Sequence, residues 1–238
     1  MTHSIPLQRE TDVGAVAVRA ADRIAALLAA RPEAVLLLPA GATPIPVYRE
    51  LARRRVDASR AWIVQLDELV GVAPTDPRSF AAFLAEHWLG PFATRPERAL
   101  LLDGSAPDPA AEIARHAARL RALPRPDLVL LGIGCNGHVA FNEPGTTLQD
   151  GARVVELAAT TRDALGTHFD GAAPTHGMTL GLAELSSGAA TLLLATGASK
   201  AAVLTRLATE PPSPSLPVSL LAGVPNVELL ADAAALPG

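Results

Sequence analysis

The sequence has one cysteine, few aromatic residues and almost no lysine. Cys135 is the single cysteine, and aromatic residues make up 3% of the 238 positions. One cysteine cannot form an internal disulfide, which excludes a disulfide-stapled secreted scaffold and predicts a reducing, cytoplasmic compartment. Of the 20 basic residues only Lys200 is a lysine. A lone ammonium group in such a chain is either an ordinary solvated side chain or a point charge that holds a phosphate.

An excess of positive charge and a long apolar run are also missing. The net charge is −4, so no nucleic-acid partner is expected. No apolar run approaches the roughly 20 residues of a membrane span, and Pro39 interrupts the longest candidate. The first ten residues are polar and lack the apolar core of a signal peptide. With 49% hydrophobic residues, residues 1–238 are predicted to form a single domain with a sizeable core and no membrane partner.

Apolar periodicity predicts strands that alternate with helices. Buried strands read as short continuous apolar runs, and helices as segments with one apolar face. Such alternation favours a parallel sheet covered on both faces. The predicted fold class is therefore α/β, a three-layer α/β/α Rossmann-like domain with a mostly parallel central sheet. Strands are expected at 35–38, 62–66, 100–102, 128–132, 190–195 and 227–230, and helices at 13–30, 44–54, 78–89, 108–121, 160–169 and 199–208.

Four of the predicted strands end in residues that can bind or react. These ends carry a turn at Gly41, the acidic pair at 67–68, the segment Gly134 to Gly145, and a turn at Gly197 that leads to Lys200. The carboxyl ends of parallel strands share one edge of a sheet, and open α/β sheets bind ligands at that edge. The sequence therefore predicts one site built from all four ends.

The segment that contains His138 is predicted to carry acid–base chemistry. Imidazole both gives and takes a proton near neutral pH. An isolated histidine is more often structural, but here a glycine turn precedes it and Glu143 follows five positions later. A carboxylate in that place can accept from the ring and fix its tautomer. Cys135, inside the same turn, is interpreted as a small apolar filler rather than a nucleophile.

Asp67 and Glu68 are both candidates for a carboxylate base. Asp67 follows a largely apolar strand, so partial desolvation would raise its basicity; alternatively it caps a helix. Neighbours on a strand point to opposite faces, so only one of the two should face a substrate. The turn Gly41-Ala42-Thr43 either offers N–H groups and a hydroxyl to a phosphate at a helix start or is an ordinary strand-to-helix turn.

Gly134 to Gly145 resembles the signature of the glucosamine-6-phosphate deaminases. Leu38 to Pro44 and Leu66 to Gly71 resemble the glycine turn and the acidic motif of that family, and the likeness spans roughly residues 11–232. The resemblance implies an enzyme that converts glucosamine 6-phosphate and water to fructose 6-phosphate and ammonia, with no metal and no organic cofactor. It also implies a single small-molecule partner, the sugar phosphate.

The resemblance assigns roles to individual residues. It implies ring opening by His138, proton transfer between C2 and C1 by Asp67, and phosphate binding by Lys200, with Glu68 as a support residue beside Asp67. The full predicted site comprises Asp67, His138, Glu143 and Asn136 as catalytic residues, and Gly41, Ala42, Thr43, Glu68, Gly137, Arg162, His168 and Lys200 as substrate- or phosphate-binding residues.

Three positions depart from the family pattern. Asn136 stands where some members have Asp, so any proton relay depends more on Glu143. His168 stands where a phosphate-binding Arg is common, and Arg162 is the candidate to compensate. Of a basic pair found in allosteric members only Arg153 is matched. We therefore expect no activation by an amino-sugar phosphate effector, and a monomer or small homo-oligomer.

Three other interpretations remain open at this point. A 6-phosphogluconolactonase would share the fold and a Gly-His turn, but it typically shows Asp-Gly-His-Thr-Ala-Ser and lacks the continuation at 141–144. A sugar-phosphate sensor domain of a repressor would need an N-terminal DNA-binding module, and roughly a dozen residues precede the first predicted helix. A deaminase for another amino-sugar phosphate, such as galactosamine 6-phosphate, is kept open by His168.

Overall fold

A seven-stranded sheet, parallel at every pairing, forms the centre of the protein. The computed structural model describes residues 4–166, 169 and 173–236. It confirms the α/β class and the mostly parallel central sheet. In spatial order the strands are β1 (Leu7–Glu10), β10 (Val227–Asp232), β9 (Thr191–Ala195), β6 (Leu128–Gly132), β2 (Val35–Leu38), β3 (Trp62–Gln65) and β5 (Ala99–Leu100).

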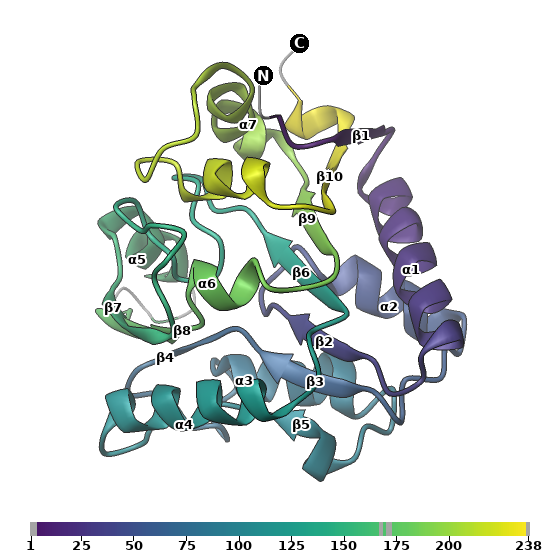
Figure 1. Cartoon of the computed structure of the whole chain (residues 1–238), viewed down its shortest axis with the longest axis vertical. Helices are drawn as coiled ribbons and strands as arrows, with labels where there is room; N and C mark the ends of the chain where they lie inside the picture. The colour runs from purple at the N-terminus through teal and green to yellow at the C-terminus, as the bar shows by residue number, and fades with distance from the viewer. Residues whose placement is uncertain (1–3, 167–168, 170–172, 237–238) are drawn as a thin grey trace.

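Helices cover both faces of this sheet (Figure 1). The helices α1 (Val13–Ala30), α2 (Ile45–Arg53) and α3 (Phe80–Leu84), the last continued by a π-helical turn (Ala85–Leu89), pack on one face. The other face carries α4 (Pro109–Ala122), α6 (Leu182–Leu185), α7 (Ala201–Thr209) and a 3-10 turn (Pro217–Gly223). Shorter 3-10 turns lie at Pro96–Arg98, Ala198–Lys200 and Ala233–Ala235.

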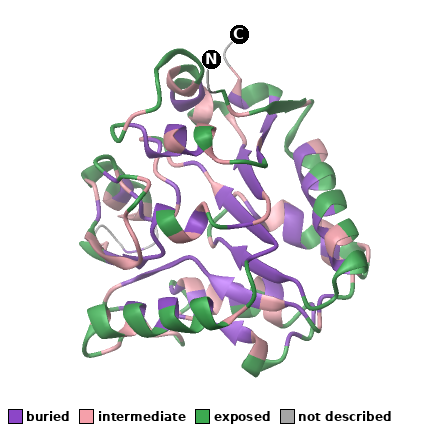
Figure 2. Cartoon of the chain, viewed as in Figure 1, coloured by how far each residue is buried: buried purple, intermediate pink, exposed green. Residues whose placement is uncertain are grey.

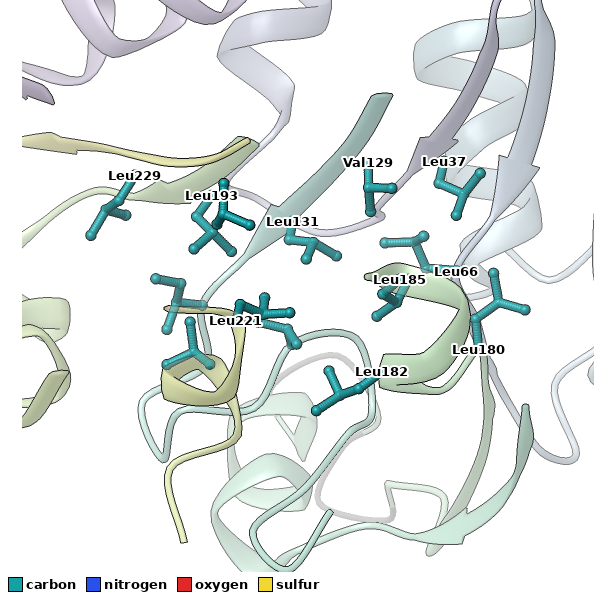
Figure 3. Packing of buried hydrophobic residues seen from close by; sticks show 14 of the residues in the cluster. Leu37, Leu66, Val129, Leu131, Leu180, Leu182, Leu185, Leu193, Leu221 and Leu229 are labelled. Atoms are coloured by element: carbon teal, nitrogen blue, oxygen red, sulfur yellow. The ribbon is translucent and has the colours of Figure 1, made fainter. Parts of the chain in front are cut away.

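Residue alternation along the strands explains the two cores. In β2, Leu36 and Leu38 join the cluster under α1 and α2, whereas Leu37 joins the cluster under α4 and α6. Leu131 of β6 and Leu185 of α6 belong to the second cluster (Figure 3). Because neighbours on a strand point to opposite faces, a sheet buried on both faces needs continuous apolar runs. The strands other than the edge strand β1 are accordingly mostly buried, while the outer faces of the helices are exposed (Figure 2).

A second, antiparallel sheet was not predicted from the sequence. Its three strands are β4 (Asp67–Leu69), β8 (His176–Thr179) and β7 (Arg153–Glu156), with β8 in the middle. Together with α5 (Ala159–Gly166) it forms a separate group of elements on the side of the molecule away from α1 (Figure 1). The sequences of β7 and β8 mix polar and apolar residues, so neither shows the apolar run of a buried strand.

Several predicted boundaries shift in the structure. The helix predicted at 78–89 begins only at Phe80, because Ser79 caps it by accepting from the N–H groups of Ala81 and Ala82. The helix predicted at 160–169 spans 159–166, and residues 167–168 lie outside the described part. The edge strand β1 was missed because its residues are mostly exposed and polar. None of the described helices is long and apolar enough to cross a membrane.

Candidate active site

The predicted strand ends meet around one cavity. In the sheet, β2 lies beside β6. The next strand after β2 is β3, on the side of β2 away from β6, and the next strand of this sheet after β6 is β9, on the side of β6 away from β2. Such a switch point is where α/β sheets bind ligands. The cavity has a volume of about 300 Å³, and its lining includes Thr43 after β2, Asp67 after β3, Asn136 and His138 after β6, and Lys200 after β9.

The turn after β6 holds the His138 ring against the backbone. Gly134 donates its N–H to the carbonyl of His138 at 2.9 Å, and a Cβ on Gly134 would collide with the imidazole ring. Gly137 has φ +90°, and a Cβ there would collide with Leu216. The His138 N–H donates to Oδ1 of Asn136 at 3.0 Å. Both glycines are therefore needed for the turn to be this tight.

Glu143 contacts the His138 ring and is not among the residues that line the cavity. Its Oε2 is 3.5 Å from Nδ1 of His138 and accepts from Nδ2 of Asn136 at 2.8 Å. Its Oε1 accepts from the N–H of Ala158 at 3.3 Å, just before α5. Burial raises the pKa of Glu143, but hydrogen bonds from His138, Thr161 and Asn136 and the charge of His138 outweigh burial and hold the pKa at about 2. Glu143 is thus a fixed anion next to an imidazole.

Asp67 is a buried carboxylate that faces the cavity. It is 7% exposed, and its side chain accepts no hydrogen bond from the described residues. Burial, and secondarily the charge of Glu68, raises the pKa of Asp67 to about 8. A carboxylate with so high a pKa is a stronger base than an ordinary aspartate, which suits proton abstraction from carbon.

Glu68 points away from the cavity and binds the start of α3. Its carboxylate accepts from Nε2 of Gln65, Oγ of Ser79 and the N–H of Ala81 at 3.0, 2.8 and 2.8 Å. The N–H groups of Leu69 and Phe80 donate to its other oxygen at 2.8 and 3.1 Å. The side chain is fully buried. It therefore connects α3 to the strand that carries Asp67 and does not line the cavity.

Lys200 reaches the cavity from the turn after β9. Gly197 has φ +85°, and its N–H donates to Oδ1 of the buried Asp232 at 3.0 Å. The same oxygen accepts from the N–H of Ala235 at 2.9 Å, so Asp232 fixes the turn. Nζ of Lys200 lies 3.7 Å from Sγ of the exposed Cys135. The ammonium group is therefore within the same cavity as Asp67 and His138.

The remaining predicted residues lie in different places. Gly41, with φ +100°, and Ala42 line an adjacent hollow beside α3 rather than the cavity itself. Arg162 is half-buried on α5 and does not line the cavity. His168 lies outside the described residues. No group of three or more His, Cys, Asp or Glu among residues 4–166, 169 and 173–236 is arranged to hold a metal.

Two threonines at the start of α5 also belong to the site, and sequence reasoning missed them. Thr160 and Thr161 line the cavity. Oγ1 of Thr161 is 3.2 Å from Nδ1 of His138, and Oγ1 of Thr160 accepts from Nδ2 of Asn136 at 3.2 Å. The predicted helix at 160–169 included both residues, but nothing in a Thr-Thr pair 22 residues beyond His138 indicates a contact with it.

A parallel sheet with acidic, imidazole and ammonium side chains gathered at one cavity at its edge is typical of an α/β enzyme. The chain belongs to the family of glucosamine-6-phosphate isomerases and 6-phosphogluconolactonases, whose model matches residues 8–228.

Individual members of this family are similar over most of the chain. It is 38% identical over 226 residues to glucosamine-6-phosphate deaminase 2 of Giardia intestinalis, covering 92% of this chain and 86% of that protein. It is 36% identical over 226 residues to glucosamine-6-phosphate deaminase of Bacillus velezensis, covering 92% and 94%. The solved structure of a monomeric glucosamine-6-phosphate deaminase matches with a TM-score of 0.94 at 31% identity, covering 97% of this chain and 98% of the other. A 6-phosphogluconolactonase from Shewanella baltica shares the fold, with a TM-score of 0.77 at 23% identity over 98% and 100% of the two chains.

Proposed function

We propose that the chain is a glucosamine-6-phosphate deaminase that acts as a single domain, residues 1–238. The observation that carries this proposal is that one cavity is lined by the high-pKa carboxylate Asp67, by the imidazole of His138 and by the ammonium group of Lys200. An amino-sugar phosphate needs a cation for its phosphate, an acid–base group for its ring and a base for its C2 proton. The similarity to deaminases at 36–38% identity supports the same activity.

Lys200 binds the phosphate in this proposal. Its ammonium group is the single lysine charge of the chain and enters the cavity beside Cys135. The hydroxyl of Thr43, which also lines the cavity, is a second group that can donate to a phosphate oxygen. Of the remaining candidates, Gly41 and Ala42 are proposed to contribute through the adjacent hollow. Phosphate binding by Arg162 and His168 stays a prediction from the resemblance.

His138 opens the pyranose ring. The imidazole takes the proton of the anomeric hydroxyl and gives a proton to the ring oxygen as the C1–O5 bond breaks, which leaves an aldehyde at C1 and a hydroxyl at C5. Between these two proton transfers the His138 imidazole is positively charged, and the Glu143 carboxylate stabilises that charge. Asn136 donates to Glu143 through Nδ2 and accepts from the backbone N–H of His138 through Oδ1. It therefore fixes the positions of these two residues relative to each other.

Asp67 transfers a proton from C2 to C1. Its carboxylate removes the C2 proton of the open-chain amino aldehyde while O1 takes a proton from the C2 ammonium group, which gives an enolamine. The protonated Asp67 then returns its proton to C1. The product is an imine at C2; water adds to it and ammonia leaves, so the ketose phosphate remains. No covalent thiol is needed, so Cys135 has no chemical role in these steps.

The test is an assay of ammonia release from glucosamine 6-phosphate and from galactosamine 6-phosphate, with 6-phosphogluconolactone hydrolysis as the competing reaction. We expect ammonia from glucosamine 6-phosphate and no lactone hydrolysis above the spontaneous rate. Faster release from the galactose epimer would reassign the substrate. Lactone hydrolysis without ammonia release would make the chain a lactonase, and binding of sugar phosphates without turnover of any of the three would make it a sensor.

The proposal extends to assembly and location. All the residues assigned to the site come from one chain, which supports a monomer or small homo-oligomer. Light scattering coupled to gel filtration measures the oligomeric state. The exposed thiol of Cys135 and a phosphorylated substrate support a cytoplasmic enzyme. Neither a nucleic acid nor a membrane takes part in the proposed reaction.

A further inference from the structure

Thr161 makes a contact in the site that the reaction scheme above does not use. It lies on α5, is 5% exposed, and its Oγ1 is 3.2 Å from Nδ1 of His138. The direct separation between Nδ1 of His138 and Oε2 of Glu143 is 3.5 Å, which is long for a hydrogen bond to a carboxylate. The hydroxyl is therefore the closer partner of the ring.

The Glu143 carboxylate fixes the direction of the hydrogen bond between Thr161 and His138. It only accepts near neutral pH, and its Oε2 lies 3.5 Å from Nδ1, so its negative charge favours the tautomer with the proton on Nδ1. A hydroxyl has one proton to donate and lone pairs with which to accept. Oγ1 of Thr161, 3.2 Å from Nδ1, therefore accepts from Nδ1–H of His138. The neutral ring then carries its proton on Nδ1, and Nε2, which accepts no hydrogen bond from the described residues, keeps a free lone pair.

We propose that Thr161 is a positioning residue for ring opening: it accepts from Nδ1–H of His138 beside the Glu143 anion and so fixes the tautomer in which Nε2 carries no proton. This inference rests on the proposed deaminase function. Nε2 takes the proton from the anomeric O1–H, and the O1–H electron pair becomes the C1=O bond. The C1–O5 bond breaks with its electrons on O5, and Nε2–H returns the proton there. The other tautomer, with its proton on Nε2, could not start this sequence as a base.

The same contacts couple the tautomer to the position of α5. The N–H groups of Thr161 and Arg162 donate to the carbonyl of Ala158 at 3.0 Å each, which forms the first turn of the helix. The N–H of Ala158 donates to Glu143. One carboxylate thus holds both the His138 turn, through Asn136, and the start of the helix that carries Thr161. A shift of α5 would take the acceptor away from Nδ1.

The experiment compares Thr161→Val with Thr161→Ser. Valine keeps the shape and loses the hydroxyl, so kcat for ammonia release is expected to fall roughly 10- to 100-fold, toward the lower end of the range for general acid–base catalysis. Serine keeps the hydroxyl and is expected to recover most of the wild-type kcat. Thr209→Val, an exposed threonine whose hydroxyl bonds only within α7, is the matched control and should behave as wild type.

Two further measurements separate positioning from folding or binding. Nitrogen-15 NMR of the His138 ring, assigned with a His138→Asn variant, should show the Nδ1–H tautomer in wild type and Thr161→Ser, and a mixture in Thr161→Val. Inhibition by 2-amino-2-deoxyglucitol 6-phosphate, which has no ring to open, should be the same in all three proteins. An unchanged kcat or an unchanged tautomer in Thr161→Val would overturn the inference. Absence of ammonia release from the wild type would instead overturn the proposed function.

Discussion

At the scale of single residues, Asp67 and Glu68 show how one fold gives adjacent carboxylates opposite environments. Glu68 accepts hydrogen bonds from five donors, whereas the Asp67 side chain accepts none from the described residues. The charged form of Asp67 is therefore disfavoured by burial and then by its neighbour, which raises its pKa to about 8. The alternation of strand neighbours predicted that only one of the two would face the substrate, and the structure places Asp67 at the cavity.

The first prediction concerns the pH dependence of catalysis. Because the Asp67 base must be ionised, kcat/KM is expected to fall as the pH decreases through about 8, the raised pKa of the free enzyme. Asp67→Asn is expected to lower kcat by about 10²- to 10⁴-fold. Rates of ammonia release between pH 5.5 and 9.5 check both effects. A variant that keeps full rate would remove Asp67 from the mechanism.

The same pKa predicts a pH-dependent stability difference. The pKa of Asp67 in the folded state lies above its ordinary value of 3.8, so the stabilisation by the protonated form is complete below about pH 4 and is lost as the pH rises through 8. Asp67→Asn cannot ionise and keeps this stabilisation. Urea unfolding should therefore show an advantage of Asp67→Asn over wild type that grows between pH 4 and 8. A constant difference would contradict the raised pKa.

A third prediction concerns the glycine under the catalytic imidazole. Gly134→Ala adds a Cβ that collides with the His138 ring, so the ring must move away from the turn. We expect kcat to fall at least about tenfold with a much smaller change in KM, because ring position affects proton transfer more than phosphate binding. Gly166→Ala, where a Cβ meets nothing within 4 Å, is the control. Equal kinetics in both variants would show that the ring has room to adjust.

At the scale of elements, the small antiparallel sheet and α3 are joined through Glu68. The carboxylate caps α3 from the strand β4, next to the Ser79 cap, so the position of Asp67 depends on both elements. Glu68→Ala leaves several buried donors unpaired and is expected to lower the free energy of unfolding by about 3 kcal/mol or more. Glu156→Ala, at an exposed position of the same sheet, should change it little. Urea midpoints compare the two, and similar losses would contradict a special role for Glu68.

At the scale of the whole molecule, Arg153 is committed to internal contacts. Its guanidinium donates to Oδ1 of Asn142, the carbonyl of Gly151 and Oγ1 of Thr146, at 3.2, 3.0 and 2.9 Å. The resemblance to allosteric members of the family places the second residue of their basic pair at position 155, which is Val155 in this chain. N-acetylglucosamine 6-phosphate is therefore expected to leave the curve of rate against glucosamine 6-phosphate hyperbolic and unchanged. Sigmoidal kinetics that the effector abolishes would refute this prediction.

The sequence by itself determined the sheet and the location of the site. Continuous apolar runs are required wherever a strand is buried on both faces, so β2, β3, β6, β9 and most of β10 were predicted from the positions of apolar residues along the chain. Glycine turns and titratable residues just after those runs predicted the cavity edge, because parallel strands end together. That reasoning works because an apolar run and a glycine turn are local properties of a segment and can be recognised without knowing its neighbours in space.

Only the tertiary structure decided which side chains touch. The second sheet forms from half-polar strands whose partners are far apart in sequence, and Thr161 reaches His138 across 23 positions. Glu143 could be expected near His138 from the sequence. Its hydrogen bonds from both Asn136 and Ala158 follow from how α5 packs against the turn. Contacts between distant segments depend on the packing of the whole chain, and no single segment of this sequence encodes them.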